Sequence, residues 1–319
     1  MAVNTGPLRP SQTAAAVELA NAIAAAEQSG EYVDLADLTA VLGAPGLDPA
    51  VDSLAVWLDD RLVGYGLVPS PDVIDGRTIV KVKGGIHPDA RRRGLGGPLL
   101  DWQLRRGRER ADVIDVEVQA VNAGGIALLG TRGFRPVRYF SVMQRSLSDP
   151  VAAVPLPDGL TAILFDPQYD EALRLAHNEI FRDHWGVTTK DEDDWRTWFT
   201  GNRAFRAASS YLVLDGDRIA AYALAYEHPV DTEKTGIREV WIGQVGARRE
   251  YRGRGVARAA MSAVLRAGQT NGYQRAGLGV DADNPTGASR LYESLGFSSV
   301  STKILQRAAR ELTPFAQEE

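Results

Sequence analysis

The sequence has 319 residues, of which 44% are apolar and 24% charged, with a net charge of −5 and no cysteine. This length fits two ordinary domains better than one, and the composition is that of a globular protein with a full core. The acidic balance argues against a nucleic-acid binder, and the lack of cysteine excludes disulfides, thiolate nucleophiles and sulfur-ligated metals.

Five segments of the first half form a series. Residues 11–28 have the apolar spacing of a helix, and residues 58–68, LDDRLVGYGLV, indicate a hairpin with an aspartate-rich turn. An apolar strand at 78–86 then leads into a glycine-rich turn and a helix at 90–100. The series ends at 116–134, where the pattern predicts a strand, an asparagine-led helix and a final strand.

The second half repeats this series in the same order. A helix is predicted at 166–181 and a hairpin at 214–225. The apolar strand at 239–247 precedes the turn and helix at 251–261, and 278–297 completes the series. Two copies of the same parts, about one domain apart, indicate duplication.

The boundary between the copies is predicted in SLSDPVAAVPLPDG, residues 146–159, whose prolines and lack of periodicity are typical of a linker. We therefore predict two domains, 1–150 and 151–319. Each is predicted to be mixed α/β, α+β-like, with strands and helices in layers around a core.

The glycine-rich turns predict anion sites, because unpaired N–H groups and the helix dipole converge at a helix N-terminus. Neither turn matches the P-loop or the dinucleotide-binding fingerprint. Both share the pattern R-x-x-G-x-G/A after an apolar strand and before a helix. The residues of this pattern are Arg91, Gly94 and Gly96 in the first half, and Arg252, Gly255 and Ala257 in the second.

The order of these elements resembles the acetyl-CoA-binding core of the GNAT superfamily of N-acetyltransferases. A strand is followed by R-x-x-G-x-G/A and a helix, and later by an asparagine and LYxxLGF. The resemblance occurs once per half and is strongest over 240–297. The tandem arrangement with a weaker first copy is similar to the actinobacterial mycothiol synthases, as is RGFRPVRYFSVMQRSL at 132–147. The resemblance implies two tandem GNAT-type domains, each a mixed twisted sheet flanked by helices, with acetyl-CoA as cosubstrate.

The resemblance also implies roles for particular residues. Backbone N–H groups of the second turn would bind the pyrophosphate of coenzyme A, and a splayed strand end would pair with its pantetheine arm. The cofactor-binding residues implied for the second half are Gln244, Val245, Ala247, Arg252, Gly253, Arg254, Gly255, Val256, Ala257 and Asn284. The alternatives are a tight strand-to-helix turn, an ordinary buried strand, a solvated Arg254 and an N-cap role for Asn284.

Tyr292 is the predicted general acid, because a tyrosine hydroxyl near the sulfur can protonate the leaving thiolate. The alternative is a half-buried tyrosine on an amphipathic helix. Aligning Gly133 with Gly296 puts Leu129 opposite Tyr292. Leucine cannot transfer a proton, so the first domain is predicted to be catalytically degenerate, although its turn can still hold a nucleotide.

A general base is harder to assign, because carboxylates are mostly exposed. Glu239, on the predicted strand, is the favoured candidate, with Glu227 and Asp281 as alternatives. His184 is either a substrate contact or a loop histidine. The histidines are too scattered to predict a metal site.

The acceptor pocket is predicted at 177–199, where aromatic residues and carboxylates suit a cationic amine. An N-capped helix with core tryptophans would give the same pattern. We predict acetyl transfer to the primary amine of a small molecule by direct attack on the thioester, in the C-terminal domain. The alternatives are a protein lysine or N-terminal acetyltransferase and a non-catalytic acyl-CoA sensor.

The remaining expectations concern surroundings and assembly. No apolar run approaches the roughly 18 residues that a membrane helix needs, and the first residues show no secretory signal pattern. We expect a cytoplasmic monomer or homodimer without a membrane or nucleic-acid partner.

Overall fold

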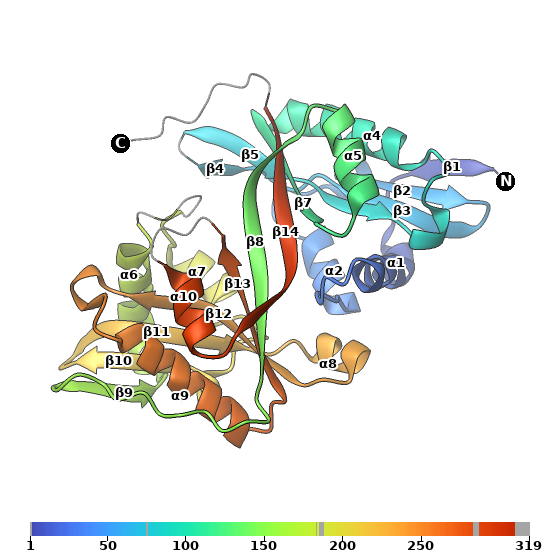
Figure 1. Cartoon of the computed structure of the whole chain (residues 1–319). Helices are drawn as coiled ribbons and strands as arrows, with labels where there is room; N and C mark the ends of the chain where they lie inside the picture. The colour runs from blue at the N-terminus through green and yellow to red at the C-terminus, as the bar shows by residue number, and fades with distance from the viewer. Residues whose placement is uncertain (1, 75, 183, 185–187, 283–286, 310–319) are drawn as a thin grey trace. The chain divides into compact units, whose positions relative to one another are not determined.

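The structure is a computed structural model that describes residues 2–74, 76–182, 184, 188–282 and 287–309. The chain divides into two compact units, and Figure 1 traces the elements of each. We call residues 1–140 with 301–319 the N-terminal unit, and residues 141–300 the C-terminal unit.

The N-terminal unit has two short sheets, ordered β1-β2-β3-β6 and β4-β5-β7. Helices α1 and α2 lie on one side of its strands, and α4 and α5 lie on the other (Figure 1). Its elements are α1 (Thr13–Ala26), α2 (Leu35–Leu42), α3 (Pro49–Asp52), α4 (Gly96–Arg110), α5 (Ala123–Thr131), β1 (Val3–Gly6), β2 (Ser53–Leu58), β3 (Arg61–Leu67), β4 (Asp72–Ile74), β5 (Arg77–Lys81), β6 (Lys83–Ile86) and β7 (Val113–Gln119).

The C-terminal unit has a sheet in the order β9-β10-β11-β12-β13, antiparallel except for the parallel pair β12–β13. Side chains of α9 and α10 cover one face, and those of α6 and α7 cover the other. Its elements are α6 (Asp170–Ile180), α7 (Glu192–Trp198), α8 (Pro229–Thr235), α9 (Val256–Thr270), α10 (Ala288–Ser294), β9 (Leu160–Leu164), β10 (Tyr211–Asp215), β11 (Arg218–Tyr226), β12 (Glu239–Ala247) and β13 (Arg275–Asp281).

Two further strands, β8 (Arg135–Ser146) and β14 (Ser298–Ala309), contribute residues to both units. The end of β8 belongs to the C-terminal unit, where Met143 joins the buried core. Residues 303–309 of β14 instead pair with β7 in the N-terminal unit, where Arg307 forms a buried, bidentate ion pair with Asp115. The two units therefore do not end at residue 150, the boundary proposed from the sequence.

The structure confirms both predicted hairpins, and it explains why the sequence of β11 is apolar throughout. The hairpins are β2–β3 and β10–β11. All of β11 after Arg218 is buried, because helices cover both faces, and such strands are apolar throughout. The long strand predicted at 78–86 differs: it breaks at Val82, whose N–H donates to the carbonyl of Asp115.

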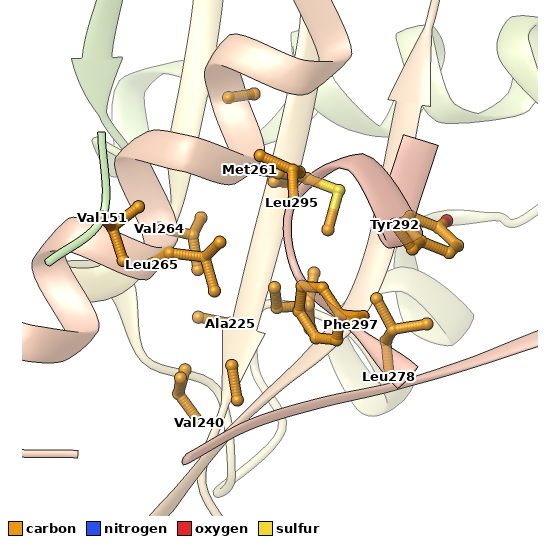
Figure 2. Close-up of a cluster of buried hydrophobic side chains, with 14 of the residues drawn as sticks. Val151, Ala225, Val240, Met261, Val264, Leu265, Leu278, Tyr292, Leu295 and Phe297 are labelled. Atoms are coloured by element: carbon orange, nitrogen blue, oxygen red, sulfur yellow. The ribbon is translucent and has the colours of Figure 1, made fainter. Parts of the chain in front are cut away.

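Helix α9 buries the apolar stripe that the sequence predicts. Val256, Ala260, Val264 and Leu265 are each 1% exposed or less. Figure 2 shows Val264 and Leu265 within the core of this unit. Full burial of one valine or leucine side chain contributes about 1.5–3 kcal/mol. This packing fixes the direction of the α9 N-terminus, where the glycine-rich turn lies.

Candidate active site

The parallel ladder between β12 and β13 stops before either strand ends. It joins 239–241 to 275–277, whereas β12 continues to Ala247 and β13 to Asp281. Beyond Trp241 the facing edges of the two strands therefore lack strand partners. The register of β12 with β11 also shifts by one residue at Gly243, which is a β-bulge.

The backbone of β12 directs particular groups into the gap beside β13. The N–H of Arg248 donates to the carbonyl of Ala220 on the β11 side. Because direction alternates along an antiparallel ladder, Gln244 also faces β11, whereas Val245 and Ala247 face the gap. Of the three strand residues proposed to bind the pantetheine arm, Gln244 thus has its backbone groups on the opposite side.

The glycine-rich turn presents N–H groups at the start of α9. Gly253 and Gly255 have φ of +73° and +79°, and a Cβ on either would meet nothing within 4 Å. The left-handed backbone, not packing, therefore requires glycine here. The N–H groups of Val256 and Ala257 precede the first intrahelical bond and have no acceptor in the helix. With the helix dipole, this geometry suits an anion.

The arginine side chains of this turn have structural partners. Arg252 donates from Nε to the carbonyl of Ala247 at 3.3 Å and from Nη2 to that of Ile180 at 3.2 Å. Arg254 lies over the ring of Tyr251, 5.4 Å from its centroid. Both guanidinium groups keep positive charge close to the turn, while Arg252 ties the turn to β12 and α6.

Tyr292, on α10, lies at the edge of the buried core. It is 9% exposed, and its ring meets Phe297 edge-on at 6.3 Å. In Figure 2 its hydroxyl points away from Met261 and Leu295. Burial raises the pKa of Tyr292 to about 12, so the hydroxyl keeps its proton at neutral pH. Within the part of the chain that the structure describes, it has no hydrogen-bond partner.

Glu239 lies at the start of the β12–β13 ladder. Its Oε2 pairs with the guanidinium of Arg275 and accepts from Gln144 Nε2 at 3.0 Å. Burial raises the pKa of Glu239 above its usual value, and Arg275 offsets only part of this effect. Oε1 lies 2.8 Å from the position of a Cβ on Gly277, so glycine at 277 makes room for the carboxylate. A carboxyl group with a raised pKa suits a general base.

Glu227 is poorly suited to proton transfer. Its carboxylate accepts from Arg206, Arg238 and Tyr273. Burial pushes the pKa of Glu227 upward, but these hydrogen bonds outweigh it and bring the pKa to about 2. Asp281 is half-buried at the end of β13.

The predicted acceptor segment contains a buried aromatic cluster, as the alternative of an N-capped helix with core tryptophans implies. His177 Nδ1 lies 2.6 Å from the hydroxyl of Tyr222, and both side chains are buried. Trp195 stacks on Phe199 at 4.3 Å, so this tryptophan belongs to the core. Trp198, in contrast, is 65% exposed.

His184 packs against the ring of Phe181 at 4.5 Å. Trp185, in the acceptor segment, and Asn284, a predicted cofactor contact, lie outside the described residues.

The first half retains the geometry of the turn. Arg91 donates from Nε to the carbonyl of Ile86 at 3.1 Å, as Arg252 does to Ala247. Arg92 and Gly94 have φ of +64° and +80°, matching Gly253 and Gly255. Gly96 opens α4.

Arg91, Gly94 and Gly96 line a cavity of about 370 Å³, together with the ends of β6 and β7. Glu27, at the end of α1, also lines it, and its Oε1 accepts from Arg91 at 2.5 Å and from Asn122 at 2.8 Å. Glu27 is far from both partners in sequence, so no sequence pattern could have indicated it.

The structure makes Leu129 the counterpart of Tyr292. The carbonyl of each accepts the N–H of the phenylalanine that follows its helix, Phe134 or Phe297. Likewise, the ladder of β5 with β7 begins at Ile79, as that of β12 with β13 begins at Glu239. Aliphatic side chains therefore occupy both positions in the first half.

The described residues contain no group of three or more His, Cys, Asp or Glu side chains placed to hold a metal ion. Nor does this part of the chain contain a helix long and apolar enough to cross a membrane.

Comparisons with known proteins agree with this geometry. The model of the acetyltransferase (GNAT) family matches residues 171–297. The mycothiol acetyltransferase of Thermobispora bispora is 30% identical over 80% of this chain and 82% of its own length. That of Streptomyces scabiei is 31% identical over 81% of this chain and 80% of its own.

Solved structures show the same fold over almost the whole chain. A GCN5-related N-acetyltransferase from Sphaerobacter thermophilus superposes with a TM-score of 0.77 at 25% identity, covering 96% of this chain and 95% of its own. A tandem GNAT protein from the clavulanic acid biosynthesis pathway has a TM-score of 0.72 at 17% identity, covering 98% and 100%. The second likeness concerns the fold alone.

Proposed function

This chain belongs to the GNAT family of acetyltransferases, and from that premise we propose that its C-terminal unit transfers an acetyl group from acetyl-CoA to the primary amine of a small molecule. The observation that carries the proposal is a difference between the units: Glu239 at the start of the β12–β13 ladder and Tyr292 on α10 stand where the N-terminal unit has Ile79 and Leu129.

Acetyl-CoA, which GNAT acetyltransferases use in general, supplies the acetyl group as a thioester. The residues present fit it. The N–H groups of Val256 and Ala257, with the left-handed glycines before them, can bind the pyrophosphate. Backbone groups of Val245 and Ala247 face the gap where an extended pantetheine arm can pair with β12.

Glu239 is the proposed base that removes a proton from the amine, directly or through one water, because its raised pKa brings it closer to neutrality. The N–H of Val245, which faces the gap, is the proposed donor to the oxyanion that forms when the amine attacks the thioester carbonyl. Tyr292 is the proposed acid: its neutral hydroxyl donates a proton to the departing thiolate.

Two observations support a small-molecule acceptor. The matched relatives are named mycothiol acetyltransferases, a name that refers to a small molecule. In addition, Trp198 is largely exposed on α7, one helical turn after Asp194, and aromatic rings with carboxylates attract an ammonium group.

A second role is proposed for the N-terminal unit: binding acetyl-CoA without turnover. Its cavity of about 370 Å³ is lined by the turn residues Arg91, Gly94 and Gly96. Leu129 and Ile79 stand where the C-terminal unit has its proposed acid and base, Tyr292 and Glu239.

Calorimetry with acetyl-CoA tests both roles, on the wild type and on Gly255→Glu and Gly94→Glu. An added carboxylate at a positive-φ turn repels the pyrophosphate and strains the backbone. Two sites, each removed by one variant, are expected. One site removed only by Gly255→Glu would restrict binding to the C-terminal unit. Wild type without any binding contradicts the proposal. Thiol release on adding primary amines then measures turnover, which only Gly255→Glu should abolish.

A further inference from the structure

Trp241 lies against two glycines of the neighbouring strand. A Cβ on Gly277 would come within 2.8 Å of Trp241 Cε3, and one on Gly279 within 3.7 Å of its Cζ2. The indole therefore extends along β13 from Gly277 to Gly279, which lie on the same face of the strand. Two residues of a strand span roughly 6.6 Å. The benzo ring lies along this part of β13, and the two glycines beneath it have no side chains.

The indole has a surface left for a ligand. Trp241 is partly exposed and packs at the border of the core cluster under α6 and α7. Within the described part of the chain, no aromatic ring stacks on it and no guanidinium covers it. An aromatic face in this setting attracts ammonium groups and the C–H faces of rings.

The carboxylate of Glu239 shares this support. Its Oε1 approaches Gly277 as closely as the indole does, 2.8 Å from a Cβ at that position. Oε2 is already engaged by Arg275 and Gln144. Oε1, which has no donor among the described residues, and the edge of the indole thus lie over the same glycine. An amine bound at Oε1 would have its carbon skeleton close to Trp241.

At the matching place, the described residues of the N-terminal unit form no such surface. The residue aligned with Trp241 in the ladder is Lys81, which pairs with Glu117 at 2.8 Å. In place of Gly277 and Gly279 stand Asp115 and Glu117, and Asp115 is engaged by Arg307. The flat apolar platform is confined to the unit that carries Glu239 and Tyr292.

We propose that Trp241 determines acceptor specificity by binding a ring of the substrate, so that the preferred acceptors are primary amines on or next to a six-membered ring. The inference rests on the proposed acetyl transfer and narrows its substrate class. Trp241 acts by orienting the amine toward Glu239 and takes no part in proton transfer.

Matched amines test the proposal. Aminomethylcyclohexane and n-heptylamine have the same carbon number and ammonium group, as do glucosamine and glucamine, and only the first of each pair is cyclic. With saturating acetyl-CoA, the wild type should prefer the ring amine in kcat/KM. Trp241→Leu should raise KM for the ring amine on the order of tenfold, with little change in kcat or for the chain amine. Trp241→Phe should restore most of the preference.

Two controls separate stacking from general damage. Gly277→Ala forces the indole and the Glu239 carboxylate to shift, whereas Gly279→Ala adds a methyl at ordinary contact distance. We expect a larger loss of ring preference for Gly277→Ala than for Gly279→Ala. Trp57→Leu removes a partly buried tryptophan of the N-terminal unit and should leave the ring-to-chain ratio unchanged.

The outcomes also distinguish this inference from the proposed function. Equal efficiency of the wild type with ring and chain amines, or an unchanged ratio in Trp241→Leu, contradicts ring binding while acetyl transfer stands. If the wild type binds acetyl-CoA but acetylates none of the four amines, the transfer to small amines is contradicted, and the inference falls with it.

Discussion

The two halves of this chain share a binding geometry but differ in the groups that could react. Both turns have left-handed residues at the same two places and an arginine bonded back to the preceding strand. The second half has Tyr292 and Glu239 at the two positions where the first half has Leu129 and Ile79. The backbone that can bind an anion has therefore been kept where the side chains for proton transfer are absent, and the two properties can be tested separately.

Tyr292→Phe should have the largest effect. Loss of the general acid is expected to lower kcat on the order of 10²–10³-fold, while acetyl-CoA affinity changes little because the turn is untouched. Thiol release at saturating substrates measures kcat, and calorimetry measures binding. The matched variant is Leu129→Phe in the N-terminal unit, which should leave kcat unchanged. Equal losses in both variants would remove the functional distinction between the halves.

Glu239→Gln should lower kcat roughly 10²-fold if the carboxylate is the base. In the wild type the base works above its pKa, so activity falls as the pH drops through the raised pKa of Glu239. Arg275 lowers that pKa, so Arg275→Met should move the acidic limb of kcat/KM to higher pH. If the acidic limb of the pH profile of kcat/KM is at the same pH in Arg275→Met as in the wild type, Glu239 is excluded as the titrating group.

The sequence predicted the repeat, the hairpins, the turns and the Tyr292–Leu129 difference, because each depends on local patterns or on spacing within one half. It could not predict that β14 pairs with β7, because that pairing joins distant residues. For the same reason it missed the contact of Glu27 with Arg91 and the two glycines under Trp241. The bulge at Gly243 did have a local signal, because an isolated glycine inside a strand often marks a bulge.

The buried His177 gives the C-terminal unit an acid sensitivity. Burial lowers the pKa of His177 to about 4, with Lys190 and His184 adding to the effect. Because this folded-state pKa lies below the usual 6.5, the neutral form stabilises the fold above pH 6.5, and stability is lost as pH falls toward 4. The loss should reach about 2 kcal/mol between pH 7 and pH 5.

Urea denaturation at the two pH values measures the loss due to His177. The double variant His177→Phe with Tyr222→Phe removes both polar groups, so neither is left buried without its partner. Between pH 7 and pH 5, the unfolding free energy of the double variant should fall by about 2 kcal/mol less than that of the wild type. An unchanged pH dependence would show that another group is responsible.

The smallest expected effect concerns the turn that the halves share. Arg92 has φ of +64°, whereas its counterpart Gly253 has φ of +73°. A residue with a Cβ in this region costs about 1 kcal/mol, so Arg92→Gly should stabilise the N-terminal unit by up to this amount. The glycine's greater freedom in the unfolded chain offsets part of the gain. Gly253→Ala should destabilise the C-terminal unit to a similar extent. If Arg92→Gly stabilises the fold and keeps acetyl-CoA binding, then the side chain of Arg92 is not needed to hold the anion in the first half.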